Sequence, residues 1–128
     1  MEKKFNILLV DDEMDFIEPI AFWLEAKGYS VQTALNGKDA LKLVGEKVPD
    51  IVLLDINMPI MNGIDTLKNI RENNQTLPVI MITAELEQLP VLQELGISGF
   101  FPKEGTLAQL EQLLEPIIRI HAKMKASE

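Results

Sequence analysis

Acidic residues stand directly after two of the short apolar runs in this chain. Asp11 and Asp12 follow the run 5–10, and Asp55 follows the run 51–54. Apolar runs of this length, bounded by turn residues, are typical of strands buried on both faces of a sheet. Because the carboxyl ends of parallel strands line the crevice where such sheets bind ligands, we expect these three carboxylates to lie close together.

This grouping of negative charge requires a compensating cation. Two carboxylates about 5 Å apart, at an effective dielectric constant near 20, repel each other by roughly 3 kcal/mol. Lys103, which follows the apolar run 99–102, supplies one ammonium group at the same predicted edge. A hard divalent ion that prefers oxygen ligands would balance the remaining charge. The sequence therefore predicts a Mg2+ site beside a lysine.

Composition limits the kind of protein that the chain can be. Its 128 residues, of which 47% are hydrophobic, are enough for one domain with a substantial core and too few for two of ordinary size. The 12 Lys+Arg against 20 Asp+Glu give a net charge of -8, which argues against direct binding of nucleic acid or of an anionic membrane. We therefore expect protein partners.

Cysteine is absent, which excludes disulfides and thiolate chemistry and fits a reducing compartment. The apolar run before Asp11 is far too short for a signal peptide or a membrane span. By elimination we expect a cytoplasmic location.

Strand and helix patterns alternate along the whole chain. Five apolar or alternating segments predict strands, at 5–10, 29–34, 51–54, 78–83 and 98–101. Helical periodicity follows each of them, at 15–27, around 40–44, and at 63–71, 90–95 and 106–125. Five strand-helix units in this order predict a parallel sheet with right-handed crossovers and helices on both faces.

The motifs, taken in order, resemble the receiver domain of two-component response regulators. They are Asp11-Asp12, Asp55, the loop Met58-Pro59-x-Met61-x-Gly63, Thr83-Ala84 and Lys103, and the likeness covers roughly residues 5 to 120. The resemblance implies a flavodoxin-like α/β fold, in which a doubly wound five-stranded parallel sheet of order 2-1-3-4-5 lies between five helices in three α/β/α layers. It also implies that residues 1–128 are a single receiver domain, with the helix 106–125 extending toward a partner or toward an output domain outside this chain.

A receiver domain is a phosphorylation-dependent signalling switch, and the resemblance assigns the reacting groups. Asp55 is implied as the phosphoacceptor, which takes a phosphoryl group from the phosphohistidine of a histidine kinase or phosphotransfer protein. Phosphoryl transfer needs chiefly an in-line nucleophile, a metal ion and cationic or hydrogen-bonding donors. Lys103 would pair with one phosphoryl oxygen, and the Thr83 hydroxyl would donate to another. The domain would catalyse only its own phosphorylation and dephosphorylation.

The resemblance also implies the Mg2+ ligands. Asp12, Asp55 and the backbone carbonyl of Asn57 would contact the ion directly, and Asp11 would act through a water molecule. Taken singly, each aspartate has a simpler interpretation, because Asp after a strand is often a turn or helix cap. The occurrence of reactive groups at the ends of several strands together favours function.

Thr83 and Phe100 are the implied switch residues, with the Phe100 ring turning inward as Thr83 moves toward the phosphate; an ordinary core role for Phe100 stays equally open. Two features depart from the family pattern. Glu104 stands where the family commonly has proline after the lysine, and the segment 83–103 is shorter than expected and contains Pro90. A short, proline-interrupted fourth helix predicts a remodelled output face.

The terminal helix carries two apolar stripes. The first is suited to packing on the sheet and consists of Leu107, Leu110, Leu114 and Ile118; the second has coiled-coil spacing and consists of Leu110, Leu113, Ile117, Ile120 and Met124. Scattered exposed apolar residues would be an ordinary alternative. We expect this helix either to form a homodimer or to continue into an output domain.

Two other functions use similar residues. A phosphatase or phosphotransferase of the haloacid-dehalogenase type also employs an aspartate nucleophile, Mg2+, threonine and lysine, but it needs a second acid two residues after the nucleophile, where this chain has Asn57. A phosphorylation-independent adaptor with a receiver fold would not require the intact acidic site.

Overall fold

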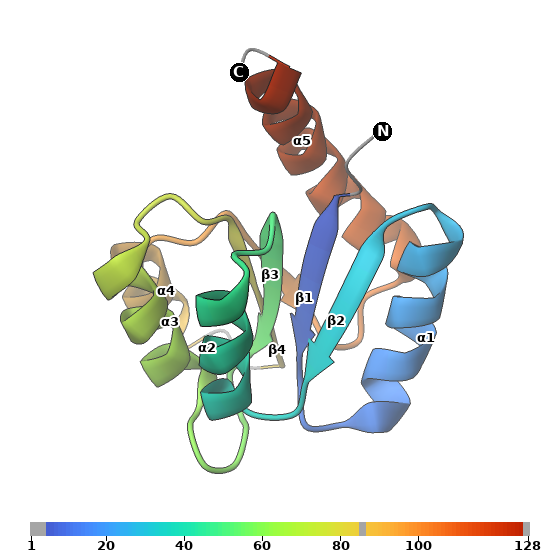
Figure 1. Ribbon diagram of the computed structural model, residues 1–128. Coiled ribbons are helices and arrows are strands. Elements are labelled where there is room, and N and C mark those ends of the chain that lie inside the picture. The colour runs from blue at the N-terminus through green and yellow to red at the C-terminus, as the bar shows by residue number, and fades with distance from the viewer. Residues whose placement is uncertain (1–4, 85–86, 127–128) are drawn as a thin grey trace.

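The structure, a computed structural model, describes residues 5–84 and 87–126, with side chains as far as His121. Within these residues, five parallel strands form one sheet in the order β2-β1-β3-β4-β5 (Figure 1), which confirms the predicted order. The strands are β1 (Asn6–Val10), β2 (Ser30–Ala34), β3 (Ile51–Asp55), β4 (Val79–Thr83) and β5 (Gly99–Pro102).

Helices cover both faces of the sheet and give the molecule three layers (Figure 1). One face carries α2 (Gly37–Glu46), α3 (Gly63–Asn73) and α4 (Leu89–Leu95), and the other carries α1 (Met14–Ala26) and α5 (Leu107–Ala126). Side-chain caps fix two of the helix starts, because Asn36 accepts from the Asp39 N–H at 2.8 Å and Asn62 accepts from the Asp65 N–H at 2.9 Å. The described residues include no helix that is long and apolar enough to cross a membrane.

The sheet divides the hydrophobic core into two clusters. Alternate residues of a strand point to opposite faces, so Leu8 and Val10 of β1 pack toward α2, α3 and α4, while Ile7 and Leu9 pack toward α1 and α5. All residues of β3 and β4 are buried. These central strands are therefore covered on both sides, as their uninterrupted apolar runs predict.

The fourth helix is short, as expected, but the predicted interruption by proline is wrong. Pro90 is the second residue of α4, in the first turn, where a missing N–H costs no helical hydrogen bond. The other end of α4 is held by Arg71 of α3, whose Nε and Nη2 donate to the Gly96 carbonyl at 3.1 and 2.8 Å. Proline thus lies in the first turn of this helix, and an arginine from the neighbouring helix anchors its end.

The predicted stripes of the terminal helix need correction. Leu110 and Leu114 are buried against the sheet, but Leu107 of the packing stripe is 38% exposed. In the predicted seam, Leu113 and Ile117 are partly buried against the same core cluster, because that side of α5 also rests on the sheet. Ile120 is 61% exposed, and the side chain of Met124 lies outside the described residues. The exposed apolar row is therefore shorter than the sequence pattern predicts.

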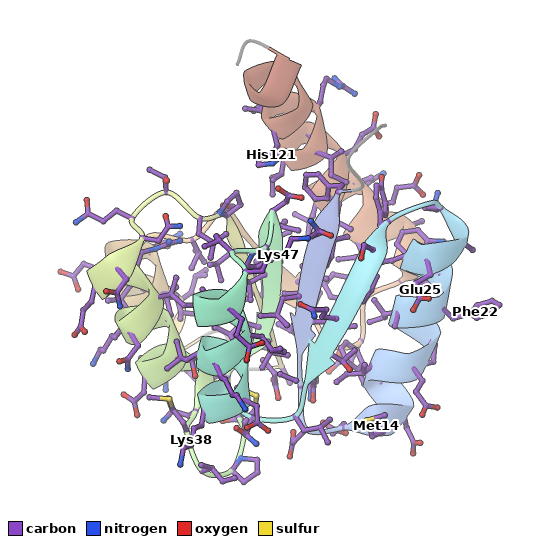
Figure 2. The ribbon with its side chains drawn as sticks, in the orientation of Figure 1. Met14, Phe22, Glu25, Lys38, Lys47 and His121 are labelled. Carbon is purple, nitrogen blue, oxygen red and sulfur yellow. The ribbon has the colours of Figure 1, made fainter. Side chains whose placement is uncertain are left out.

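The far end of α5 is tied to the edge of the sheet opposite the strand ends that bear the acidic residues. His121 Nε2 lies 2.6 Å from Asp50 Oδ1, and the other oxygen of Asp50 accepts the Asn6 N–H at 2.6 Å. Figure 2 places His121 at this end and Met14, the first residue of α1, at the other. The terminal helix thus spans the sheet and is fastened beyond the starts of β1 and β3.

Gly63 sets how closely α3 approaches β3. The Gly63 N–H donates to the Ile56 carbonyl at 2.8 Å. A Cβ at this position would lie 2.1 Å from the Asp55 carbonyl oxygen and 2.8 Å from the Ile56 Cα. Both contacts are with backbone atoms, so they cannot be relieved by a side-chain rotation.

We expect Gly63→Ala to destabilise the protein by about 3 kcal/mol, because overpacking against rigid backbone forces the strand and helix apart. Urea unfolding measures the change. Gly45→Ala is the matched control, since a Cβ there meets nothing within 4 Å and alanine favours a helix by about 0.5–1 kcal/mol over glycine. Equal stability of the two variants would contradict this account of the α3 start.

Candidate functional site

The predicted site residues converge at the carboxyl edge of the sheet. Asp11 follows β1, Asp55 is the last residue of β3, Thr83 is the last residue of β4, and Lys103 follows β5. The register pairs Val10 with Leu54 and Thr83 with Pro102, so the neighbouring strands end level with one another. Residues up to 92 positions apart therefore meet at one place.

Three carboxylates form the centre of the site. Asp11, Asp12 and Asp55 each offer one oxygen atom, and these atoms all lie within 4.8 Å of one another. Asp11 is 0% exposed and Asp55 is 2% exposed, whereas Asp12 faces solvent. Two of the three carboxylates are thus removed from water. In this buried position their mutual repulsion is only weakly screened.

Lys103 is the cation that the described structure provides for these carboxylates. Its Nζ lies 3.2 Å from Asp11 Oδ2 and 3.4 Å from Asp55 Oδ2, and it also contacts the carboxylate of Glu13. The ring of Phe16 approaches the ammonium group, with 5.3 Å between Nζ and the ring centroid. The lysine is therefore held by the ends of β1 and β3 and by the first turn of α1.

The burial of charge perturbs the proton affinities of the site. Burial, with a further contribution from the charge of Asp11, raises the pKa of Asp55 to about 6 despite the opposing effect of Lys103. Burial likewise raises the pKa of Asp11 above its usual range. For Lys103 burial lowers the pKa, but the Glu13 hydrogen bond and the charges of Asp55 and Asp11 outweigh it and raise the pKa overall. The single ammonium group of Lys103 thus compensates the two buried aspartates only in part.

The donor set fits a divalent metal ion. Asp11 Oδ1 accepts the Glu13 N–H at 2.9 Å, but the buried Asp11 Oδ2 has no hydrogen-bond partner, its approach to Lys103 being an ion pair only. A buried carboxylate oxygen without a hydrogen bond is costly unless a cation binds it. Three close carboxylate oxygens form an arrangement that hard cations such as Mg2+ prefer.

The remaining predicted residues lie around this centre. Thr83 is 3% exposed, and its carbonyl accepts the Lys103 N–H at 3.2 Å. Asn57 is exposed in the loop that follows β3. Phe100 is half-buried on β5 beside Met81 of β4, while its neighbour Phe101 joins the core on the other face of the sheet. The Lys103–Glu104 peptide bond is trans, in common with all described residues.

The loop between β3 and α3 is strained beside the predicted nucleophile. Ile60 has φ 69°, a left-handed conformation that costs a β-branched residue about 1–2 kcal/mol. The Met61 N–H donates to the Pro59 carbonyl at 2.7 Å, and the Met61 carbonyl accepts the Gly37 N–H at 3.3 Å. Contact with the start of α2 thus helps to hold the loop in this shape.

Sequence reasoning missed Glu13, which the structure brings to the site. It follows Asp11 and Asp12 directly and occupies the N-cap position of α1. The run of three acidic residues was visible in the sequence, but its third member could be assigned only through contact with Lys103, 90 residues away.

Comparisons with known proteins agree with this geometry. A family model described as the response regulator receiver domain matches residues 7–115. The chain is 41% identical over 117 residues to the transcriptional regulatory protein CpxR of Escherichia coli (strain K12), covering 89% of this chain and 49% of that protein. It is 33% identical over 121 residues to the alkaline phosphatase synthesis transcriptional regulatory protein PhoP of Bacillus subtilis (strain 168), covering 93% of this chain and 50% of that protein.

The chain spans about half the length of these curated relatives. Among solved structures, it is similar to the chemotaxis response regulator CheY4 of Vibrio cholerae, with a TM-score of 0.84 and 26% identity, covering 90% of this chain and 99% of that one.

The raised pKa of Asp55 gives a stability prediction. The pKa of Asp55 in the folded chain, about 6, lies above the ordinary value of 3.8. Ionisation of Asp55 therefore lowers the stability of the fold as the pH rises from about 4 to about 6. In EDTA at pH 7.5, Asp55→Asn should therefore be more stable than the wild type by about 1–3 kcal/mol. This advantage should shrink as the pH is lowered toward 4, as urea unfolding at several pH values would measure. A variant that is less stable at pH 7.5, or equally advantaged at every pH, would contradict the assignment.

Proposed function

The chain belongs to the family of response regulator receiver domains of two-component signalling, and from this we propose that Asp55 is its phosphoacceptor. The domain takes a phosphoryl group from the phosphohistidine of a histidine kinase or phosphotransfer protein and thereby changes its surface for a partner. The observation that carries the assignment is the buried Asp55 carboxylate at the end of β3, where Lys103 and two further carboxylates meet it.

The proposed reaction is a displacement at phosphorus. An Asp55 oxygen attacks the phosphorus atom, the P–N bond to the histidine breaks, and the electron pair of that bond stays with the imidazole nitrogen, which takes up a proton. The product is an acyl phosphate on Asp55. A pKa of about 6 leaves the attacking carboxylate mainly ionised at neutral pH, and Lys103 is within reach to pair with a phosphoryl oxygen.

Mg2+ is the proposed cofactor. Asp12, Asp55 and the backbone carbonyl of Asn57 are the proposed direct ligands, and Asp11 is the proposed ligand through a water molecule. When bound, the ion supplies positive charge that balances the carboxylates against the incoming phosphoryl oxygens. Asp11 Oδ2 supports this role, because this buried oxygen has no hydrogen-bond partner and could accept from a metal-bound water.

Thr83 and Phe100 are the proposed switch residues. Thr83 ends β4 next to Asp55 on β3, and its carbonyl is bonded to the Lys103 N–H, so movement at the phosphoryl group can reach β5 through these strands. Phe100 lies on β5 and is only half-buried, and in this proposal its ring turns inward as Thr83 moves toward the phosphoryl group. The remodelled output face would then consist of β5 and the short α4.

The wider role is also a proposal. Two relatives are named transcriptional regulatory proteins and are about twice as long as the matched region, which supports control of an output domain or protein partner. In this proposal the receiver itself binds neither nucleic acid nor membrane, resides in the cytoplasm, and catalyses only its own phosphorylation and dephosphorylation.

We predict that acetyl phosphate adds one acid-labile phosphoryl group to the protein, only in the presence of a divalent metal and only when Asp55 is present. Intact-mass spectrometry would show a gain of one phosphoryl group in the wild type and none in Asp55→Asn. Asp15→Asn is the matched control, because it removes an exposed carboxylate from the first turn of α1 and should react as the wild type does. Modification of Asp55→Asn at the wild-type rate would overturn the assignment.

A variant of Lys103 separates phosphorylation from signalling. Lys103→Ala should still accept some phosphate, but backbone NMR shifts in β4 and β5 should no longer follow phosphorylation. If phosphorylated Lys103→Ala showed the same NMR shifts in β4 and β5 as phosphorylated wild type, the proposed relay through Thr83 and Phe100 would be contradicted.

The terminal helix is the proposed homodimer contact, reduced by the structure to its exposed part around Ile120. With Mg2+ and beryllofluoride, the wild type should dimerise at high micromolar concentration in analytical ultracentrifugation, and Ile120→Glu should shift it to monomer. Gln112→Glu adds the same charge at another exposed position of α5 and should leave the dimer intact. A monomeric wild type under all these conditions would exclude the dimer and favour continuation of the helix into an output domain.

A further inference from the structure

Glu13 contacts the lysine of the site but lies outside the proposed phosphoacceptor and metal ligands. Its carboxylate binds Lys103 Nζ, and its side chain is 61% exposed. Asp11 and Asp55, the other carboxylates that contact Lys103, are 0% and 2% exposed. Of the three acidic groups around the ammonium, Glu13 is therefore the one that is exposed to solvent.

The side chain of Glu13 is not used to cap α1. Glu13 is the N-cap residue, and its carbonyl accepts the N–H groups of Phe16 and Ile17 at 3.0 and 3.1 Å, but its carboxylate makes no capping hydrogen bond. Residues with short polar side chains stabilise an N-cap by about 1 kcal/mol through such a bond. Here the carboxylate extends to Lys103 instead, so its contact is one that the helix start does not require.

The position of Glu13 links both members of the buried ion pair. Its N–H donates to Asp11 Oδ1 at 2.9 Å, while its carboxylate binds the lysine that faces Asp11 Oδ2. The Phe16 ring, one turn further along α1, approaches the same ammonium group. The start of α1 thus fixes where Lys103 stands relative to Asp11 and Asp55.

An ammonium group has three N–H donors, and three carboxylates surround that of Lys103. A phosphoryl oxygen that pairs with Lys103 must therefore replace one of them. Asp11 and Asp55 are proposed to hold Mg2+, through water and directly, so with the ion bound Glu13 would be the carboxylate that still competes for the lysine.

Building on the proposed phosphoacceptor function, we propose that Glu13 is a positioning residue that holds Lys103 in the resting domain. Its contact with Lys103 breaks when the phosphoryl group pairs with the lysine. Its carboxylate then sets how tightly the site retains that group. Removing the charge of Glu13 while keeping its backbone N–H for Asp11 should strengthen binding of a phosphoryl mimic, because Lys103 no longer has to leave a partner.

The test is beryllofluoride binding at saturating Mg2+, measured by titration calorimetry. Glu13→Gln should bind beryllofluoride about threefold to fivefold more tightly than the wild type, the range expected for one partly exposed ion pair. Glu104→Gln is the control, since it removes the same charge from the exposed residue next to Lys103 in sequence. Equal or weaker binding by Glu13→Gln, or an equal gain in Glu104→Gln, would overturn the proposal.

A second readout isolates the contact from the reaction. In metal-free protein at low temperature, the Lys103 ammonium should give a 1H–15N NMR signal that is protected from exchange in the wild type and in Glu104→Gln, and lost or sharply weakened in Glu13→Gln. An unchanged signal in Glu13→Gln would refute the resting contact. If the wild type does not bind beryllofluoride at all, the phosphoacceptor function fails, whereas the NMR signal still decides whether Glu13 holds Lys103.

Discussion

Placing two buried carboxylates beside one ammonium group at the edge of a parallel sheet is the constraint on which the rest of this molecule depends. Asp11 and Asp55 could be left in water at little cost, yet both are buried where the central strands β1 and β3 end. Lys103 compensates them only in part, as the raised pKa values of both aspartates indicate. The core on both faces of the sheet supplies the stability that keeps this repulsion in place.

The surrounding elements hold the charged groups at fixed positions. Gly63 brings α3 against the carbonyl of Asp55, and the strained loop at Ile60 is held by the start of α2. The start of α1 contributes Glu13, which bonds both Asp11 and Lys103. In this response regulator receiver domain, the residues of the proposed phosphoryl site are thus already held together by contacts from several strands and helices.

Much of this could be predicted from sequence because the signals were local. Uninterrupted apolar runs located β3 and β4, and the polar residues that follow the runs located Asp11, Asp55 and Lys103. Contacts between distant residues could not be read in the same way. The bond between Glu13 and Lys103 joins positions 90 residues apart, the burial of Leu113 depends on how α5 lies on the sheet, and Pro90 could interrupt or start a helix depending on where the first turn falls. The match to receiver domains also decides against the haloacid-dehalogenase alternative.

The central claim, that the three carboxylates hold a divalent cation, is tested most directly by calorimetric titration of Mg2+ into the wild type and Asp12→Ala at pH 7.5. Asp12 faces solvent, so its removal should leave the fold intact while withdrawing one oxygen from the cluster. The account predicts one Mg2+ bound per wild-type chain and binding at least about tenfold weaker in Asp12→Ala, the scale of loss expected when a charged ligand is removed. Equal Mg2+ affinity in the two proteins would contradict it.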